Sequence, residues 1–213
     1  MENKVIVIGL GHKMFCGKDT VAAHWKEKFG VIPVSFAYKL KAIVKDLYGL
    51  TEEHTNGKLK QEPILELGGI TPRTIMQKFG TNNREIYDKV WVEYLFRSVI
   101  SSFPSGTIVA IPDCRFPNEA EYIKNKKGYV VKVNRDTSNF SISAEQRAHP
   151  SETSLDSYGF DFVIDNNGSL EELYEKADAV LSNIISLSRG NGIEYGKTSQ
   201  SSPGFQESFF FGI

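Results

Sequence analysis

A short apolar run that leads into a glycine-bounded loop constrains this chain more than any other feature. Residues 5–8 read Val-Ile-Val-Ile, and such a β-branched run closed by glycine is typical of a buried strand. Residues 9–20 read GLGHKMFCGKDT, and apolar residues at helical spacing begin directly afterwards. A strand, a glycine-bounded loop with a Gly-Lys pair and then a helix is the context that a phosphate-binding loop requires. The sequence therefore predicts an α/β domain with an anion site after its first strand.

The chemistry of this loop follows from its glycines and its lysine. Glycines let backbone N–H groups turn toward an anion, and the N-terminus of the following helix adds a partial positive charge. Lys18 would lie beside the β- and γ-phosphates of a nucleotide, and a following hydroxyl would ligate Mg²⁺. The loop departs from the general pattern twice, because five residues separate Gly11 from Gly17 and because Asp19 precedes the first hydroxyl, that of Thr20. A turn whose glycines are only structural is the alternative, but the strand–loop–helix context favours phosphate binding.

Apolar runs alternate with helical patterns along most of the chain. Strands are predicted at residues 5–8, 32–37, 107–111, 129–133 and 160–164. Helices are predicted at residues 21–29 and 40–47, from Arg84 onward, between Pro117 and Gly128, and at residues 170–185. Proline near the start of a helix and glycine past its end are the usual punctuation, and Ser169 with Glu172 forms a capping-box pattern. The alternation predicts a mostly parallel, five-stranded sheet with helices on both faces.

A length of 213 residues fits one domain, or one domain with a small insertion. We expect this domain to span residues 1–188. Residues 51–69 are polar and irregular and are predicted to be an insertion or mobile loop. Residues 135–157 are interpreted either as a mobile lid over the phosphates or as a solvated loop, and residues 189–213 as a flexible tail.

Charge and composition exclude several classes of partner. Lys and Arg number 25 against 26 Asp and Glu, and this balance gives no electrostatic support for binding nucleic acid or an anionic membrane. No apolar run approaches the roughly 20 residues that a membrane helix needs. Two cysteines make no disulfide scaffold, so we expect a cytoplasmic location.

A second group of charged residues follows a later strand. The run at residues 107–111 ends at Pro112-Asp113, and Arg115 and Glu119 follow closely. In folds of this kind that strand often neighbours the first, which would bring Asp113 close to the phosphate loop and its Mg²⁺. A solvated aspartate at a strand end is the alternative, but three charged residues at one edge favour a site.

With these residues identified, the chain resembles the deoxynucleoside monophosphate kinases of tailed phages. The resemblance covers most of residues 4–185, is weak over 51–69 and does not reach the tail. The segments that carry it are GKDT at residues 17–20, RTIMQKFGT at 73–81 with Trp91 after it, DCRFPNE at 113–119 and DNNGSLEEL at 165–173.

This resemblance implies a P-loop NTPase fold and phosphoryl transfer from ATP to a deoxynucleoside 5′-monophosphate. The implied ATP site comprises Gly11, Lys13, Cys16, Gly17, Lys18, Asp19 and Thr20, with Mg²⁺ held by Thr20 and Asp113. The implied acceptor site comprises Arg73, Thr74, Gln77, Gly80, Thr81, Trp91, Asp113, Arg115 and Glu119. The implied catalytic groups are Lys18, Asp19, Asp113 and Arg115. Apart from the resemblance, Arg135 or Arg147 in residues 135–157 is a candidate to stabilise the charge of the transition state. The turn at residues 166–168, with Asn167, is interpreted either as bordering the adenine or as an Asn-Gly turn for its own sake. The resemblance also implies a homodimer in the cytoplasm of an infected cell.

Simple chemistry makes these roles reasonable and leaves alternatives open. An acceptor phosphate needs a guanidinium, for which Arg73 and Arg115 are candidates. A nucleobase needs a stacking surface, which Trp91 offers, although its place on an apolar helical stripe suits core packing equally. Two rival functions remain. A dephospho-coenzyme A kinase would share the loop and differ in the acceptor half, and a regulatory module would bind ATP without turnover.

Overall fold

The computed structural model describes residues 5–190, which divide into two compact units. The sheet unit comprises residues 5–35 and 99–190, and the helical unit comprises residues 36–98. No helix among the described residues is long and apolar enough to cross a bilayer.

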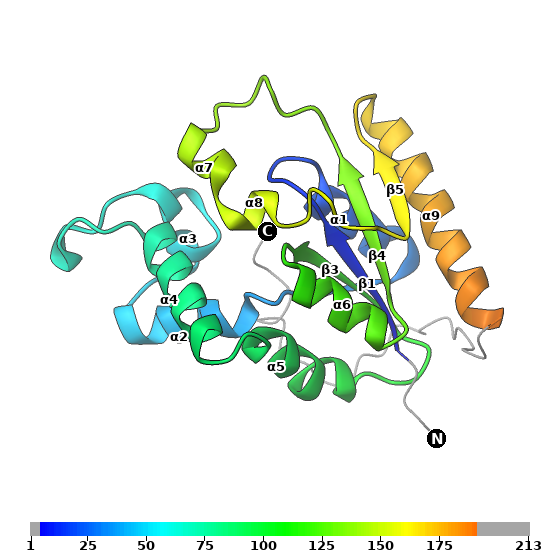
Figure 1. The fold of residues 1–213 in the computed structure, drawn as a ribbon, viewed down its shortest axis with the longest axis horizontal. Coiled ribbons are helices and arrows are strands. Elements are labelled where there is room, and N and C mark those ends of the chain that lie inside the picture. The colour runs from blue at the N-terminus through cyan, green and yellow to red at the C-terminus, as the bar shows by residue number, and fades with distance from the viewer. Residues whose placement is uncertain (1–4, 191–213) are drawn as a thin grey trace. The chain divides into compact units, whose positions relative to one another are not determined.

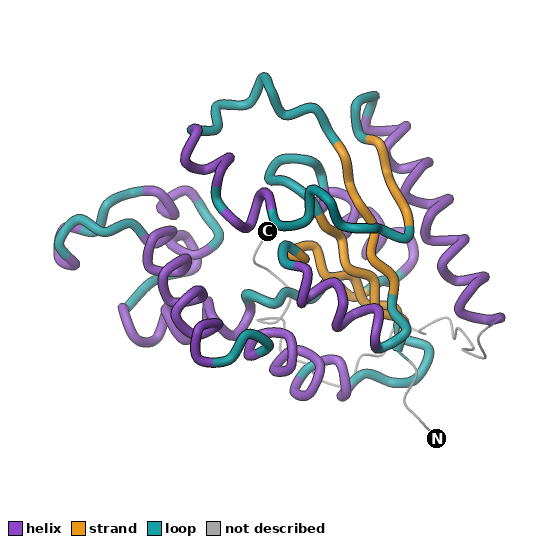
Figure 2. The backbone as a smooth tube through the Cα atoms, viewed as in Figure 1, coloured by secondary structure: helices purple, strands orange, loops and turns teal. Residues whose placement is uncertain are grey.

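The sheet unit is built on five parallel strands (Figures 1 and 2). The strands are β1 (Ile6–Gly11), β2 (Ile32–Pro33), β3 (Ile108–Cys114), β4 (Tyr129–Asn134) and β5 (Phe162–Asp165). Their order is β2-β3-β1-β4-β5, and every neighbouring pair is parallel. The register of β1 on β3 places Gly11 opposite Cys114. The predicted parallel sheet and the predicted neighbourhood of the first and third strands are therefore confirmed.

One face of the sheet is covered by α1 (Lys18–Phe29) and α9 (Leu170–Gly190). Alternate residues of β1 point to this face and share a core with both helices. Trp25 of α1 is completely buried, and its Nε1 donates a hydrogen bond to the Ala177 carbonyl of α9 at 3.2 Å. This contact fixes the first helix against the last, which holds the start of α1 at the edge of the sheet.

The opposite face is covered by α6 (Pro117–Asn125), which contacts β1 and β4 (Figure 1). Gly9 points to this side, and a Cβ there would lie only 2.6 Å from Cδ1 of Ile123. Glycine at position 9 therefore allows α6 to approach the strand that precedes the loop. Helices on both faces agree with the prediction. The unit also contains a short 3₁₀ turn (Ile100–Ser102), α7 (Ala144–Ala148) and α8 (Pro150–Thr153).

The helical unit contains no strand among its described residues. Its elements are α2 (Tyr38–Tyr48), α3 (Glu52–Thr55), two 3₁₀ turns (Lys58–Gln61 and Leu65–Leu67), α4 (Pro72–Ile86) and α5 (Val90–Ser98). Helix α4 begins with proline at its first position, and the Thr71 hydroxyl accepts the N–H of Thr74 at 3.2 Å.

Three predicted elements differ in the structure. The helix predicted from Arg84 is wrong, because α4 ends at Ile86 and the extended backbone of Tyr87 (φ −153°, ψ 111°) separates it from α5. The strand predicted at 32–37 is only Ile32–Pro33, an edge strand in which proline has no N–H to extend the ladder. Residues 51–69 form short helical turns rather than an irregular loop, and Thr55 within them is completely buried. The predicted tail lies outside the described residues except for its first two, which complete α9.

Candidate active site

The loop between β1 and α1 has the backbone that an anion site requires. Gly17 is the N-cap of α1 in a left-handed conformation (φ 102°, ψ 14°), and a Cβ there would lie 2.5 Å from Nδ2 of Asn166. His12 and Phe15 also have positive φ angles of 100° and 59°. Gly17 offers no side-chain cap to the first N–H groups of the 12-residue helix α1. These N–H groups carry the partial positive charge of a helix start, which favours phosphate.

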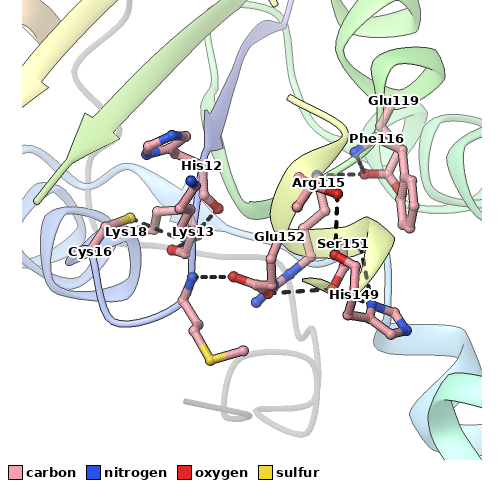
Figure 3. A network of polar contacts seen from close by, with 12 residues as sticks. His12, Lys13, Cys16, Lys18, Arg115, Phe116, Glu119, His149, Ser151 and Glu152 are labelled. Carbon is pink, nitrogen blue, oxygen red and sulfur yellow. Dashed lines mark hydrogen bonds and ion pairs between the residues drawn. The ribbon is translucent and has the colours of Figure 1, made fainter. Parts of the chain in front are cut away.

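Lys18 is folded into this loop (Figure 3). Its side chain is only 4% exposed, and Nζ donates to the carbonyl of His12 at 3.0 Å, to the carbonyl of Lys13 and to Sγ of Cys16 at 3.4 Å. Burial lowers the pKa of the Lys18 ammonium from its usual value. A phosphate would supply the negative charge that such a buried ammonium lacks, so this lysine suits the role predicted for it.

An asparagine that follows β5 forms a hydrogen bond with the phosphate loop. The buried side chain of Asn166 donates from Nδ2 to the Cys16 carbonyl at 2.9 Å. Asn167, which sequence reasoning singled out, is exposed, and its Oδ1 accepts the N–H of Asp136 at 2.8 Å. The structure thus brings Asn166 rather than Asn167 into contact with the loop.

A partly solvated aspartate interacts with the start of the loop. Lys13 Nζ lies 3.2 Å and His12 Nε2 lies 3.7 Å from Oδ1 of Asp156. The pKa of His12 is lowered to about 4, first by burial and then by the positive charge of Lys132. Nδ1 of His12 is buried without a hydrogen-bond partner among the described residues. His12 is therefore neutral at pH 7, and Lys13 is directed to Asp156.

Asp113 lies at the carboxyl end of β3, next to the strand that leads into the loop. Its Oδ2 accepts a hydrogen bond from the Ser35 hydroxyl at 2.7 Å. No group of three or more His, Cys, Asp or Glu residues in the described part of the chain could hold a metal ion. Mg²⁺ is usually bound by one or two protein oxygens together with water and substrate phosphates. The oxygen donors of Asp113 and Thr20 therefore fit Mg²⁺ better than a metal enclosed by protein.

Glu119 has a structural position rather than an open one. It is 2% exposed, and its Oε2 accepts the N–H groups of Arg115 at 2.7 Å and of Phe116 at 3.1 Å. These two bonds form the turn into α6. Glu119 therefore fixes the backbone that carries Arg115.

Glu152 is a residue of the site that sequence reasoning missed. It belongs to α8, its side chain is 3% exposed, and it forms an ion pair with Arg115 (Figure 3). Its Oε2 also accepts the N–H of Met14 from the phosphate loop at 2.6 Å. The pattern of residues 149–152 marks a helix start, but nothing in it reveals a buried carboxylate.

The remaining part of the predicted lid contains two arginines in different settings. The guanidinium of Arg135 lies 5.2 Å from the ring centre of Phe140, which stacks on Phe15 of the loop at 5.5 Å with the rings nearly parallel. Arg147 instead donates to the carbonyls of Thr137 and Phe140 within its own segment. Arg135 therefore contacts the ring that stacks on the loop, whereas Arg147 bonds backbone carbonyls of its own segment.

The predicted acceptor residues of the helical unit lie mainly on α4. Arg73, Gln77 and Thr81 are spaced by four residues and so share one face of the helix. Gly80 belongs to a different face, where a Cβ would lie 2.9 Å from Cδ1 of Leu40.

Two other predicted acceptor residues have structural contacts within this unit. The Thr74 hydroxyl lies 2.9 Å from that of Thr71 at the start of α4. Trp91 is 5% exposed, and its Nε1 donates to the Gly80 carbonyl at 3.2 Å. This burial favours the packing role that the sequence left open for Trp91.

The parallel sheet of order 2-3-1-4-5 and the Gly-Lys loop that joins its central strand to α1 define a P-loop kinase fold. The family model for deoxynucleotide monophosphate kinase matches residues 64–177. A protein of Acanthamoeba polyphaga mimivirus, named as a deoxynucleotide monophosphate kinase, is 31% identical over 198 residues, which cover 86% of this chain and 100% of the relative. The chain therefore belongs to the deoxynucleotide monophosphate kinase family.

Two solved structures are similar to this chain at low sequence identity. TT1252 from Thermus thermophilus has a TM-score of 0.52 and 18% identity, with 84% of this chain and 98% of that chain covered. Shikimate kinase from Acinetobacter baumannii in complex with shikimate has a TM-score of 0.48 and 16% identity, with coverage of 87% and 96%. The likeness to TT1252 concerns the fold alone.

Proposed function

We propose that this chain transfers the γ-phosphoryl group of ATP to a deoxynucleoside 5′-monophosphate, giving ADP and the deoxynucleoside 5′-diphosphate. The observation that carries this proposal is the buried Lys18 ammonium inside a loop that ends at a helix N-terminus. Membership in the deoxynucleotide monophosphate kinase family supports the choice of acceptor.

In the proposed reaction, an oxygen of the acceptor phosphate attacks the γ-phosphorus of ATP. The bond from that phosphorus to the bridging oxygen breaks, and its electron pair leaves with ADP. Because the second pKa of a phosphate monoester is about 6, the attacking oxygen is already ionised at neutral pH and needs no general base. The chain has to supply positioning and charge stabilisation, which are the main needs of phosphoryl transfer.

We assign the donor phosphates to the loop and to the start of α1. Gly11, Gly17 and Cys16 would contribute backbone groups, and Lys18 would neutralise the β- and γ-phosphates. Asp19 is exposed on the first turn of α1 and would help to hold the ATP phosphates and Mg²⁺ at the edge of the donor site. Thr20 and Asp113 would hold Mg²⁺, which would supply positive charge to neutralise the phosphates.

Within the helical unit, we assign the acceptor to the face of α4 that carries the half-buried Arg73. Within the sheet unit, Arg115 after β3 is a candidate for binding a substrate phosphate. Each of these arginines suits a phosphate, because guanidinium groups match phosphate oxygens in a bidentate geometry. Gln77 and Thr81 share the face of Arg73 and would contact the nucleoside. Thr74, Gly80 and Trp91 would support that face through their contacts within the helical unit.

Several finer features are part of the same proposal. Residues 135–157 would act as a lid, with Arg135 stabilising charge on the transferred group and Asn167 bordering the adenine. The chain would form a homodimer in the cytoplasm of an infected host, as its resemblance to the phage kinases implies. Light scattering on the purified chain tests the dimer, and a monomeric mass at assay concentrations would refute it.

A coupled turnover assay with ATP and Mg²⁺ tests the function. The acceptors are dAMP, dGMP, dCMP and dTMP, the corresponding ribonucleotides, and dephospho-coenzyme A. We expect turnover of at least one deoxynucleotide, abolished in Lys18→Ala and in Arg73→Ala and retained in Lys78→Ala, an exposed lysine on the same helix. Turnover of dephospho-coenzyme A alone would identify the rival kinase, and ATP binding without any turnover would favour a regulatory module.

A further inference from the structure

A single buried carboxylate joins three parts of the sheet unit that are distant in sequence. Glu152 Oε2 accepts the N–H of Met14, which lies 138 residues earlier. Its Oε1 pairs with Nη1 of Arg115 and accepts a hydrogen bond from the Ser151 hydroxyl at 3.3 Å. Figure 3 shows the carboxylate between the loop and the arginine. Glutamate is almost never fully buried unless it is paired, and here every contact of the carboxylate is with a donor.

The position of Met14 explains why this carboxylate matters to the loop. Met14 lies in the five-residue stretch between Gly11 and Gly17, which is one residue longer than the general phosphate-loop pattern. Its N–H is directed to Glu152 at 2.6 Å. On the other side, the Lys18 ammonium holds two loop carbonyls. The longer loop is therefore fixed through the Met14 N–H by Glu152 and through two carbonyls by Lys18.

The same carboxylate restricts the conformations of Arg115. The backbone N–H of Arg115 is held by Glu119, and its guanidinium is held at Nη1 by Glu152. The arginine side chain is 31% exposed, so part of the guanidinium remains accessible. An arginine has five N–H donors in a fixed plane. Fixing one nitrogen therefore sets the direction in which the remaining donors point.

We propose that Glu152 is a positioning residue for phosphoryl transfer, because it holds the Arg115 guanidinium and the Met14 segment of the phosphate loop in a fixed relation. This inference rests on the proposed function. Arg115 contacts the substrate phosphates, and Glu152 acts through it. A displacement of about 1 Å in such a group costs on the order of 100-fold in rate. Removing the charge of Glu152 therefore lowers kcat much more than it raises either KM.

The test uses the full chain with Glu152→Gln, Arg115→Ala and the double variant. Glutamine keeps the shape and one acceptor oxygen for Met14 but removes the charge opposite Arg115. We expect kcat of Glu152→Gln to fall about 10- to 100-fold, with the KM values for ATP and acceptor changed less than about threefold. In the Arg115→Ala background, the same substitution has little further effect on kcat, because the group that it orients is gone. Glu175→Gln, an exposed carboxylate of α9, is the matched control and leaves kcat unchanged.

A second readout does not depend on turnover. Hydrogen exchange at the Met14 amide reports its bond to Glu152 directly. We expect faster exchange in Glu152→Ala and retained protection in Glu152→Gln and Glu175→Gln. If the wild type turned over no acceptor, the proposed function would be wrong. The exchange measurement alone would then test whether Glu152 holds the Met14 N–H.

Three results overturn the proposal. The first is a kcat of Glu152→Gln within twofold of an active wild type. The second is full additivity of the Glu152 and Arg115 substitutions in kcat, which indicates that Glu152 has only a general structural role. The third is Met14 exchange in Glu152→Ala that equals that of the wild type.

Discussion

Replacing Gly17 by alanine tests the backbone geometry of the phosphate loop. Gly17 has φ 102° and ψ 14°, and a left-handed conformation costs a residue with a Cβ about 1–2 kcal/mol. The new Cβ would also lie 2.5 Å from Nδ2 of Asn166, whose amide bonds to the Cys16 carbonyl. Displacing that amide removes a hydrogen bond worth about 1 kcal/mol. We therefore expect Gly17→Ala to lower the free energy of unfolding by about 2–3 kcal/mol.

Urea unfolding of the wild type and of two variants measures this loss. Gly49→Ala is the control, because Gly49 also has a positive φ of 65° but has nothing within 4 Å of its added Cβ. It should lose only the backbone contribution, about 1–2 kcal/mol. Trp25 and Trp91 report on the sheet unit and on the helical unit by fluorescence. Equal destabilisation by the two substitutions would refute the reasoning about Asn166.

A double variant isolates the contact between the loop and Asn166. In an Asn166→Ala background, the added Cβ of Gly17→Ala meets no amide, so only the backbone cost remains. The two substitutions together should therefore destabilise the protein by about 1 kcal/mol less than the sum of the single effects. Additive losses would show that the close approach in the structure has no energetic consequence.

Three further predictions concern the lysine of the loop, the buried tryptophan and the buried histidine. Lys18→Met should lower kcat by at least about 100-fold, because it removes a preorganised charge at the transferred phosphate. Lys13→Met should change kcat less than about threefold. Similar losses of kcat in both variants would contradict the separate roles of the two lysines. Trp91→Phe should lower the free energy of unfolding in urea by about 1 kcal/mol, because it loses the hydrogen bond to the Gly80 carbonyl. It should also raise KM for the acceptor but not for ATP. A raised KM for ATP alone would contradict the acceptor assignment. The pKa of His12 is lowered from 6.5 to about 4, so between these pH values the unfolded chain binds a proton that the folded chain does not. The free energy of unfolding should therefore fall as the pH drops from about 6.5 to 4. This fall should be smaller in His12→Asn, and an identical pH dependence in that variant would contradict the prediction.

The five strands and the loop could be predicted from the sequence because their signals are local. Each signal indicates the backbone conformation of a few neighbouring residues, as a β-branched run, a glycine at a turn and a proline at a helix start do. The prediction of a helix from Arg84 was wrong because a local signal can also be incomplete. Its apolar stripe has helical spacing, but that spacing does not show that the backbone becomes extended at Tyr87.

The contacts of the candidate site could be predicted only in part. Lys18 and Asp113 follow from a motif and from a strand end, and the structure brings both to the carboxyl edge of neighbouring strands. Asn166 and Glu152 reach the loop across 150 and 138 residues of chain, and no local pattern reports such a contact. Trp91 was consistent with stacking or packing, and its burial favours packing.

The sequence by itself determined the order of the five strands, the Gly-Lys loop and the family. Only the tertiary structure decided which polar groups meet, with Glu152 between Met14 and Arg115, and Asn166 rather than Asn167 on the loop. The physical reason is that backbone conformation depends mainly on neighbours along the chain. The pairing of a buried charge, in contrast, depends on the donors that packing brings around it, and those donors come from strands and helices far apart in the sequence.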